Sequence, residues 1–457
     1  MKEEVKNLGY LEGLDPVELV AYPTILILIL IWAWRKSKQR SPMEPDYKYF
    51  FIGVLAKILG ASAFCAVYTY YYKGGDTIAY YESARAYVNL LFEDPTSFWT
   101  AYTHGAVEEN MYLFKSTTGY PWGYMFMDPK TNLLIRVITP FVLLGMNGYL
   151  LSSIFFSLAC FTGTWKLYRL FCNYYPDYRK YLAITILLFP SAVFWGSGML
   201  KDTLTFSSVC WLVVGFESFF IRKKRSISNI LILVFSFLLL LLIKPYFIIA
   251  VIPGCIIWNF YDRILKIKNK LIRVSAIPFI LVFSSVLGYV ILVNAIGFSI
   301  DSLLEEAVVK QADLKREEYN GNSFDIGTYE PTLQGASTVA VPAMVAGLFR
   351  PFIWEAKNVV MIFSGMENFF VLVLLILVLF RVRVIGFFSL VFRHPIVMFC
   401  LFYTLIFSLI VGLSTSNFGA LVRFKIAFLP FFTSALLIMF FEASRKKSAS
   451  RILRDKH

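Results

Sequence analysis

Long apolar segments recur along almost the whole chain, and they constrain its fold more than any other feature. A helix needs about 20 mostly apolar residues to cross a bilayer. Eleven segments come close to this length, at residues 17–34, 49–72, 147–171, 181–197, 203–221, 228–243, 246–261, 275–297, 357–380, 395–413 and 424–442. Because a spanning segment must satisfy its own backbone hydrogen bonds, each is expected to be a helix. The sequence therefore predicts an all-α polytopic membrane protein with about eleven transmembrane helices, forming a single integral membrane domain over 1–457.

The composition agrees with lipid as the main solvent. Of the 457 residues, 58% are hydrophobic and 16% are charged, and the mean hydropathy is +0.64. A soluble domain of this length would expose too much apolar surface. The net charge is +14, but the basic residues form short runs between apolar segments rather than a patch on a readable module. Nucleic acid is therefore not expected as a partner.

The basic runs predict the orientation of the spans. They occur in alternate loops, where they read RKSKQR at 35–40, RKKR at 222–225, DRILKIKNKLIR at 262–273 and SRKKSASRILRDK from 444 onward. Cytoplasmic loops are enriched in Lys and Arg. The N-terminus is therefore expected outside and the C-terminus in the cytoplasm.

Two long loops then face the external side, at 73–131 and 298–356. Both exceed the usual connection length, and long ordered loops often carry function. The first is expected to contain amphipathic helices. The second is expected to be a lid, solvated over 301–330, with a re-entrant or interfacial helix at about 337–349. A half-length apolar segment at 132–145 is expected at the membrane interface.

Asp76 is the candidate catalytic residue of the first external loop. It follows Gly74 and Gly75, which let the chain turn sharply from the preceding helix. One interpretation makes Asp76 an N-cap for the next helix. The other places an acid just above the membrane plane, where it acts as a general base or holds a cation that meets a phosphate leaving group.

Several cations are predicted at the same depth. Lys201 and Asp202 follow a segment loosened by a proline and two glycines. They form either an ion pair with an N-cap, or a lysine presented to an anion and oriented by Asp202. Lys244 and Arg423 also lie at external ends of spans. Snorkelling explains either one alone but explains the set less well, because external ends carry few cations.

The second long loop ends in RPFIWEAKN, where Arg350 and Glu355 are expected to face each other or a ligand. Glu367 lies inside the ninth predicted span. A carboxyl at this depth belongs either to a proton path or to a polar contact between helices. The sequence favours a hydrogen-bonded structural role, because the acid is isolated.

Together these residues match the parts of a lipid-linked sugar. Its tail lies in the bilayer, its phosphate at headgroup depth and its glycan outside. Cations at that depth bind phosphate and stabilise it as a leaving group. A carboxylate such as Asp76 deprotonates an acceptor hydroxyl, and aromatic rings such as Trp122 stack on sugar faces.

The layout resembles the GT-C superfamily of polytopic glycosyltransferases. The resemblance is carried by GGDTIAYY with Asp76, FPSAVFWGSGMLKD, IKPY, RPFIWEAKN and NFGALVRFKIAFLPF. The last four also resemble bacterial membrane proteins found near polysaccharide polymerases. The resemblance implies a polyprenyl-phosphate-linked sugar donor, with Asp76 as the base or metal contact and Lys201 and Arg423 as phosphate contacts.

Further substrate-binding candidates are Asp202, Lys244, Tyr246, Arg350, Glu355 and Asn417. A divalent cation is a possible cofactor, although the first loop lacks the adjacent acidic pair common in protein mannosyltransferases. The expected partners are the lipid-linked glycan, membrane lipid and envelope-biosynthesis proteins. The expected location is the bacterial cytoplasmic membrane, with the active site on its external face.

Three other functions remain open at this point. An O-antigen-type polysaccharide polymerase or ligase would rely mainly on the cations. A lipid-glycan flippase or transporter would place charged residues at several membrane depths. A non-catalytic scaffold would disperse its external polar residues.

Lys201→Ala and Arg423→Ala are each expected to weaken donor binding, because each removes a proposed phosphate contact. Glycan turnover measured over a range of donor concentrations tests this. Unchanged turnover in both variants would mean that the phosphate assignment is wrong.

Overall fold

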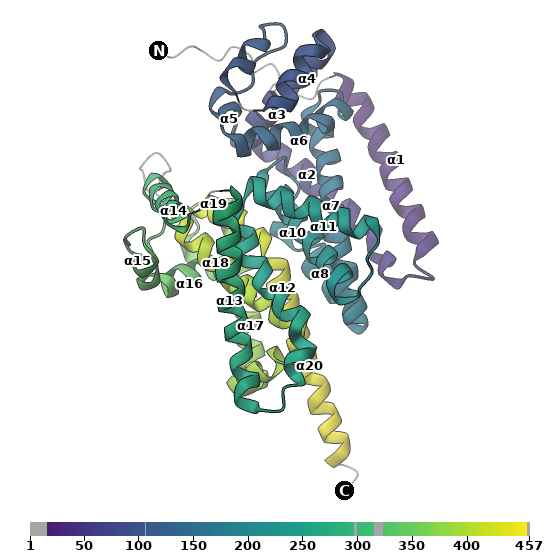
Figure 1. Ribbon diagram of the computed structural model, residues 1–457. Helices are drawn as coiled ribbons and strands as arrows, with labels where there is room; N and C mark the ends of the chain where they lie inside the picture. Colours follow the sequence, from purple (N-terminus) through teal and green to yellow (C-terminus); the bar gives the residue numbers. More distant parts are fainter. Residues whose placement is uncertain (1–15, 106, 297–298, 315–322, 455–457) are drawn as a thin grey trace. The chain divides into compact units, whose positions relative to one another are not determined.

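A computed structural model describes residues 16–105, 107–296, 299–314 and 323–454 of the chain (Figure 1). The first helices are α1 (Pro16–Arg40), η1 (Pro45–Tyr49), α2 (Phe50–Ala66), η2 (Val67–Tyr71), α3 (Asp76–Glu93), α4 (Pro95–His104), η3 (Glu108–Leu113), α5 (Gly123–Met127) and α6 (Pro129–Leu144). They are followed by α7 (Tyr149–Tyr174), η4 (Pro176–Tyr178), α8 (Arg179–Ile186), α9 (Pro190–Phe194), α10 (Lys201–Phe216), η5 (Glu217–Ile221), α11 (Ile227–Ile243), α12 (Tyr246–Leu265) and α13 (Lys270–Ile296). The last are α14 (Ile300–Leu314), α15 (Leu333–Thr338), α16 (Ala340–Phe349), η7 (Ile353–Glu355), α17 (Val359–Val391), α18 (Pro395–Ser414), α19 (Phe418–Phe424), η8 (Lys425–Ala427) and α20 (Leu429–Arg454).

The prediction of a helical membrane protein is confirmed. Within the described ranges there is no β-strand, and eight helices are long and apolar enough to cross a membrane. They are Val20–Arg40, Pro45–Tyr71, Tyr149–Tyr174, Lys201–Ile221, Tyr246–Leu265, Leu271–Val290, Val359–Val391 and Pro395–Ser414. A ninth candidate is the pair Phe418–Ala427 and Leu429–Arg445, which is bent by 60°.

Three of the eleven predicted spans are not continuous helices of full length. The segment 181–197 is divided between α8 and α9, with the break just before Pro190. Proline has no backbone N–H, so it ends a helix more readily than it continues one. The segment 228–243 lies within α11, which has 17 residues, and 424–442 contains the 60° bend. The count of eleven crossings therefore stays a prediction.

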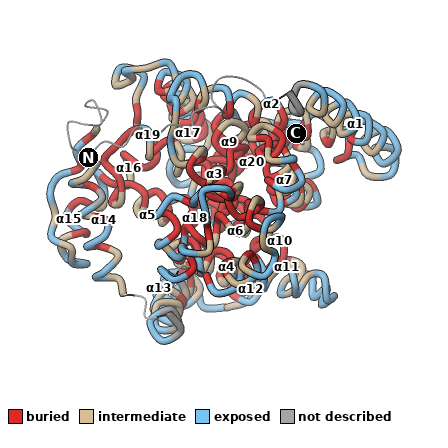
Figure 2. The backbone as a smooth tube through the Cα atoms, turned by 90° about the horizontal axis from the view of Figure 1, so that it is seen from above, coloured by how far each residue is buried: buried red, intermediate tan, exposed pale blue. Residues whose placement is uncertain are grey.

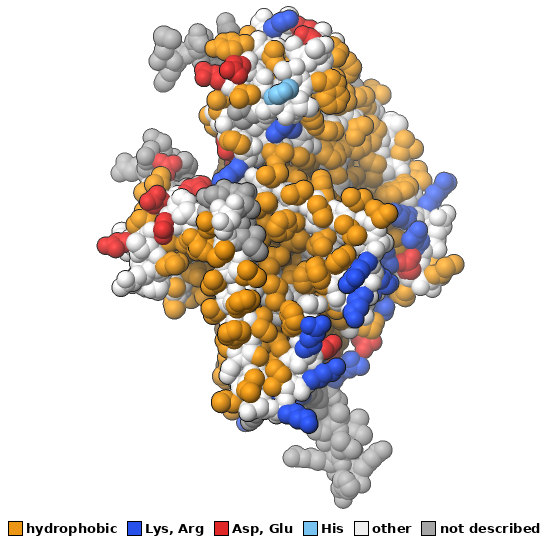
Figure 3. Space-filling model, in the orientation of Figure 1, with side chains coloured by type: hydrophobic (Ala, Val, Ile, Leu, Met, Phe, Trp, Pro, Cys, Tyr) orange, Lys and Arg blue, Asp and Glu red, His pale blue; other side chains and the backbone are white. Residues whose placement is uncertain are grey.

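Apolar side chains are exposed along several of the long helices. Leu28 on α1 and Phe279 on α13 are both more than half exposed, and exposed residues follow both helices (Figure 2). Hydrophobic side chains also cover much of the visible face in the space-filling view (Figure 3). Apolar patches of this extent mark a surface that meets lipid or another apolar partner rather than water.

The described helices group into two compact units. Unit 1 comprises residues 1–172, 192–210 and 242–244, and unit 2 comprises 173–191, 211–241 and 245–457. This division does not test the predicted single membrane domain, which stays a prediction.

In unit 1, α2 packs closely against the segment that precedes α10. A Cβ atom on Gly198 would overlap the ring of Phe64 on α2. The ammonium of Lys57, which is 3% exposed, donates to the carbonyl oxygens of Ala192 at 3.2 Å and Gly196 at 2.6 Å. Carbonyls near a helix end have no partner within the helix, so this buried lysine satisfies them. Lys57 was not among the residues predicted from the sequence to be important.

In unit 2, α16 and α18 approach each other through small residues. Gly347 and Gly412 each lie so close to the opposite helix that a Cβ atom would overlap its backbone, at Ser408 and Ala343 respectively. Each helix thus presents two small residues four positions apart. This pattern lets apolar helices pack backbone to backbone in a membrane. It also explains how the short apolar helix predicted at about 337–349 is held.

Lys425 caps the C-terminal end of α16. The residue is 1% exposed. Its ammonium donates to Leu348 O at 3.0 Å, Arg350 O at 2.5 Å and Asn368 Oδ1 at 3.0 Å. A lysine ammonium has three N–H donors, and all three meet an acceptor. Lys425 lies next to the bend between α19 and α20, and it too was not predicted from the sequence to be important.

The beginning of the second long loop is a packed helix. α14 contacts α18, and the Ser416 hydroxyl donates to Gln311 O at 2.8 Å. The lid expected over 301–330 thus begins with a helix that packs on α18, while residues such as Asp301 and Glu305 are exposed, and its role as a lid stays a prediction. The part of that lid at 315–322 lies outside the described residues.

Gly412→Ala is expected to lower stability by about 1–3 kcal/mol, because the added methyl overpacks the α16–α18 contact. Gly288→Ala on α13 is the matched control, since no atom lies within 4 Å of its Cβ position. At position 288 the higher helix propensity of alanine is expected to raise the free energy of unfolding by about 1 kcal/mol. Thermal unfolding in detergent measures both. Equal effects in the two variants would contradict the packing argument.

Candidate functional site

Asp76 lies at a sharp turn between η2 and α3 in unit 1. Gly74 and Gly75 have φ values of +149° and +116°, which side chains other than glycine rarely adopt. The N-cap position is Gly75, and Asp76 is the first residue of α3. The N-cap role considered for Asp76 therefore falls to Gly75. A carboxylate in the first helical turn still interacts favourably with the helix dipole.

Helix α6 packs along α3 and brings a second carboxylate into this region. Figure 1 shows α3, α4, α5 and α6 gathered at one end of unit 1. Asp128 is the N-cap of α6, and it accepts hydrogen bonds from Lys130 N at 3.3 Å and Thr131 N at 3.1 Å. The Thr131 hydroxyl also donates to Asp128.

Lys201 pairs with Asp128, not with its neighbour Asp202. The Lys201 ammonium donates to Asp128 Oδ2 at 3.2 Å and to Thr131 Oγ1 at 2.5 Å. Asp202 instead accepts from the Lys244 ammonium at 2.5 Å. The expected pairing of Lys201 with Asp202 is therefore corrected. Adjacent residues on a helix point in different directions, and this separates the two side chains at the start of α10.

The pair of Asp202 and Lys244 is the more deeply buried of the two. Its side chains are 5% and 12% exposed, whereas those of Asp128 and Lys201 are 41% and 21% exposed. The turn between α11 and α12 supplies Lys244, and the first turn of α10 supplies Asp202. Breaking such a pair leaves an uncompensated buried charge, which costs more than breaking an exposed one.

Electrostatic interactions join the two pairs to Asp76. The Lys201 ammonium interacts with the charges of Asp128, Lys244 and Asp76. Partial burial acts to raise the pKa of the Asp128 carboxyl, but the Thr131 hydroxyl and the Lys201 charge hold it below its ordinary value. We call Asp76, Asp128, Lys201, Asp202 and Lys244 the Lys201 cluster.

Four of the residues predicted from sequence thus meet in one unit. Asp128 and Thr131 were missed, although the sequence Asp-Pro-Lys-Thr carries a recognisable signal. Asp before Pro is a frequent N-cap followed by proline at the first helical position. That signal predicts where α6 begins, but it does not predict that the capping carboxylate also pairs with Lys201.

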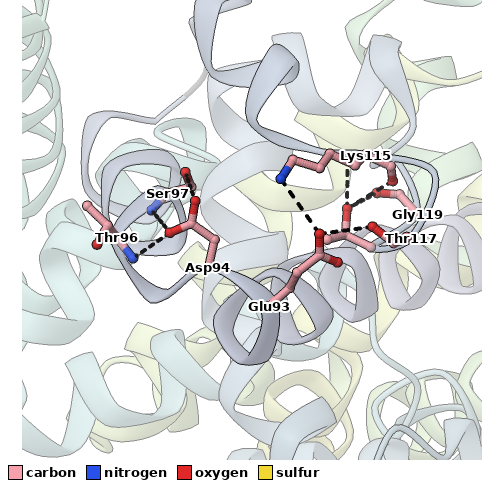
Figure 4. Close-up of polar contacts among 8 residues, drawn as sticks. Glu93, Asp94, Thr96, Ser97, Lys115, Thr117 and Gly119 are labelled. Carbon is pink, nitrogen blue, oxygen red and sulfur yellow. Dashed lines mark hydrogen bonds and ion pairs between the residues drawn. The ribbon is translucent and has the colours of Figure 1, made fainter.

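The chain leading to Asp128 is anchored on α3. The Glu93 carboxylate accepts from Thr117 Oγ1 at 3.0 Å and lies 3.7 Å from the Lys115 ammonium (Figure 4). Further along, Trp122 Nε1 donates to Glu82 Oε2 at 2.7 Å. Burial raises the pKa of the Glu82 carboxyl despite this hydrogen bond. These contacts fix the segment 115–122 against the helix that begins with Asp76.

Arg350 and Glu355 lie in unit 2 and face each other, as one of the two sequence interpretations expected. The Arg350 guanidinium is 2.7 Å from Glu355 Oε1, and it donates to Asp325 O at 3.2 Å. Glu355 also accepts from Phe352 N at 2.8 Å. These bonds close the loop after α16.

The other unit 2 candidates have contacts that shape helix ends. Asn417 caps α19, accepting from Gly419 N at 2.8 Å and Ala420 N at 3.3 Å. The Arg423 guanidinium lies over the Phe424 ring at 5.7 Å, and the Tyr246 ring contacts Phe407 at 6.1 Å. Their roles in substrate binding stay predictions.

Glu367 has the structural role that the sequence favoured. Its carboxylate accepts from Ser191 N at 2.8 Å and from Ser191 Oγ at 2.5 Å. Both partners belong to unit 2, where this bond ties the start of α9 to α17. A carboxylate that is satisfied in this way stabilises a contact between helices.

In the described ranges, no three or more His, Cys, Asp or Glu side chains group so that they could hold a metal ion. The Lys201 cluster has three carboxylates, but its two ammonium groups already interact with them.

Comparison with protein-family models, with curated proteins and with solved structures gives no match to this chain. The resemblance to the GT-C superfamily therefore stays a prediction.

Asp202→Ala and Lys244→Ala are each expected to lower stability by about 3–5 kcal/mol, because each leaves a buried charge unpaired. The double variant Asp202→Ala/Lys244→Ala should lose less than the sum of the two. The matched control is the exposed pair Lys115–Glu93, with side chains 61% and 36% exposed, where breakage costs about 0–1 kcal/mol. Thermal unfolding of the single and double variants gives the coupling. Additive losses at 202 and 244 would show that the pair is not coupled.

Proposed function

We propose that this chain is a membrane-integral glycosyltransferase acting at the Lys201 cluster. It would move a sugar from a polyprenyl-phosphate-linked donor to an acceptor hydroxyl. The observation that carries the proposal is the electrostatic interaction of the Lys201 ammonium with both Asp76 and Lys244, at the ends of apolar helices. A base and cations placed at headgroup depth are what transfer from a lipid phosphate requires.

The proposed reaction uses the groups of the cluster as follows. The Asp76 carboxylate takes the proton of the acceptor hydroxyl, and that oxygen bonds to the anomeric carbon of the donor sugar. The bond between this carbon and the phosphate oxygen breaks, and its electron pair stays on the lipid phosphate. Lys201 and Lys244 stabilise the charge that the phosphate gains.

Lys201 retains capacity for this role. Its ammonium has three N–H donors, and in the described part of unit 1 its hydrogen bonds go to two acceptors, on Asp128 and Thr131. The cluster is also partly open, because the Asp128 side chain is 41% exposed. A phosphate oxygen could therefore become the third acceptor without breaking either existing bond.

The ends of the spans support an external site. Asp76 follows the span Pro45–Tyr71, and Lys201 begins the span Lys201–Ile221. The opposite ends of these helices carry Lys48 and the basic run that starts at Arg222. A helix of about 20 residues is about 30 Å long, which supports a placement of the cluster and the basic ends on different sides of the membrane. With basic loops inside, we infer eleven crossings, an external N-terminus, a cytoplasmic C-terminus and a site on the external face of a bacterial cytoplasmic membrane.

A transporter would also need charged groups within the membrane, and Lys57, Glu367 and Lys425 are charged residues in or beside the apolar helices of the described chain. Each of them is engaged with helix ends or with the backbone. Buried charges used in this way stabilise broken helices and do not form a path. This observation favours the transferase over the transporter.

Asp76→Asn is expected to leave the protein folded and to lower glycan transfer by about 10²–10⁴-fold, the usual contribution of a general base. Asp76→Glu should keep part of the activity. Glu109→Gln, which changes an exposed acid of the same loop, is the control and should transfer at the rate of the unaltered protein. The measurement is labelled glycan product formed in membranes that contain equal amounts of each variant. A well-expressed Asp76→Asn protein with full activity would remove Asp76 from the mechanism.

A further inference from the structure

Trp122 is held against α3, the helix that begins with Asp76, and Tyr124 follows it at the start of α5. Trp122 is tied to α3 twice: its Nε1 donates to Glu82 Oε2 at 2.7 Å, and its backbone N donates to Ser83 Oγ at 3.1 Å. The ring centroids of Trp122 and Tyr124 are 6.1 Å apart, and their planes meet at 78°. The two rings therefore form a corner with a defined orientation.

This corner lies beside the Lys201 cluster. The charge of Asp76 acts on the Tyr124 phenol, and partial burial together with that charge raises its pKa. The Glu82 carboxylate lies next to the Trp122 ring, since it accepts a hydrogen bond from Trp122 Nε1. Tyr124 and Trp122 nevertheless remain 67% and 38% exposed. Aromatic surface is thus presented to a ligand next to two carboxylates.

Sugar rings have the chemistry that this arrangement fits. A pyranose has an apolar C–H face and a rim of hydroxyl groups. Aromatic rings supply a large, rigid apolar surface on which the C–H face can stack. Ionised carboxylates accept hydrogen bonds from the hydroxyl groups.

A lipid headgroup is the competing occupant, because Trp and Tyr are enriched at membrane interfaces. Two observations disfavour it. The indole N–H of Trp122, which would bond to a headgroup, already donates to Glu82. The nearby carboxylates Glu82 and Asp76 would repel an anionic phosphate brought directly to the rings.

We propose that Trp122 and Tyr124 form a subsite for a pyranose ring of the acceptor, and that Glu82 positions Trp122 within it. The assignment of this sugar to the acceptor rests on the proposed function. The binding of a pyranose does not, because it can be measured without transfer.

The test uses the full chain in lipid nanodiscs with cellobiose, chitobiose and lactose as probes, followed by saturation-transfer NMR. At least one probe should bind, and Trp122→Ala and Tyr124→Ala should each weaken its binding by about tenfold. Trp122→Phe should restore much of the loss, since it keeps an aromatic face. Trp99→Ala is the matched control, because Trp99 is also exposed, at 57%, but lies on α4. It should leave binding unchanged.

The outcomes separate this proposal from the proposed function. Failure of all three probes to bind, or equal losses in Trp122→Ala and Trp99→Ala, would overturn the subsite. If Trp122→Ala weakens binding while Asp76→Asn retains transfer, the subsite stands and the proposed chemistry fails. If Asp76→Asn stops transfer while Trp122→Ala changes neither disaccharide binding nor the acceptor KM, the transferase stands and the subsite is wrong.

Glu82→Gln should keep binding close to that of the unaltered protein, because the amide oxygen still accepts from Trp122, whereas Glu82→Ala should resemble Trp122→Ala.

Discussion

Backbone carbonyls at the ends of broken helices need partners where water is scarce, and two buried lysines provide them. Lys57 bonds to Ala192 and Gly196 in unit 1, and Lys425 bonds to Leu348 and Arg350 in unit 2. An unsatisfied carbonyl in an apolar medium costs several kcal/mol. The short helices α9 and α16 therefore depend on these ammonium groups, and so does the irregular chain that leads from α9 to Lys201.

The same need for capping explains how the Lys201 cluster is built. The start of α6 requires an acceptor for its first N–H groups, and Asp128 supplies it. The charge that caps the helix also fixes Lys201. Structural and candidate functional roles are thus combined in one carboxylate, and the position of the lysine follows from where α6 begins.

The apolar runs predicted most of the spans because hydropathy averages over many residues. The same averaging concealed Lys57 and Lys425, each a single charge in an apolar segment. It also joined α8 to α9 across Pro190, where local backbone chemistry decides the break. Lys201 and Lys244 were singled out because cations are unusual at the predicted external ends of spans. The pairing of Lys201 with Asp128, 73 residues apart, could not be predicted, since it depends on how α6 packs on α3.

The charge balance of the cluster bears on the proposed reaction. Three carboxylates and two ammonium groups give it an excess of one negative charge when all are ionised, so a donor phosphate enters against some repulsion. During transfer the phosphate gains negative charge, while Asp76 becomes neutral by taking the acceptor's proton. One negative charge therefore moves from Asp76 to the phosphate, and the total charge near Lys201 and Lys244 stays constant. Their attraction to the leaving group is then strongest when Asp76 has been protonated, which couples proton removal to bond cleavage and favours the transition state over the bound donor.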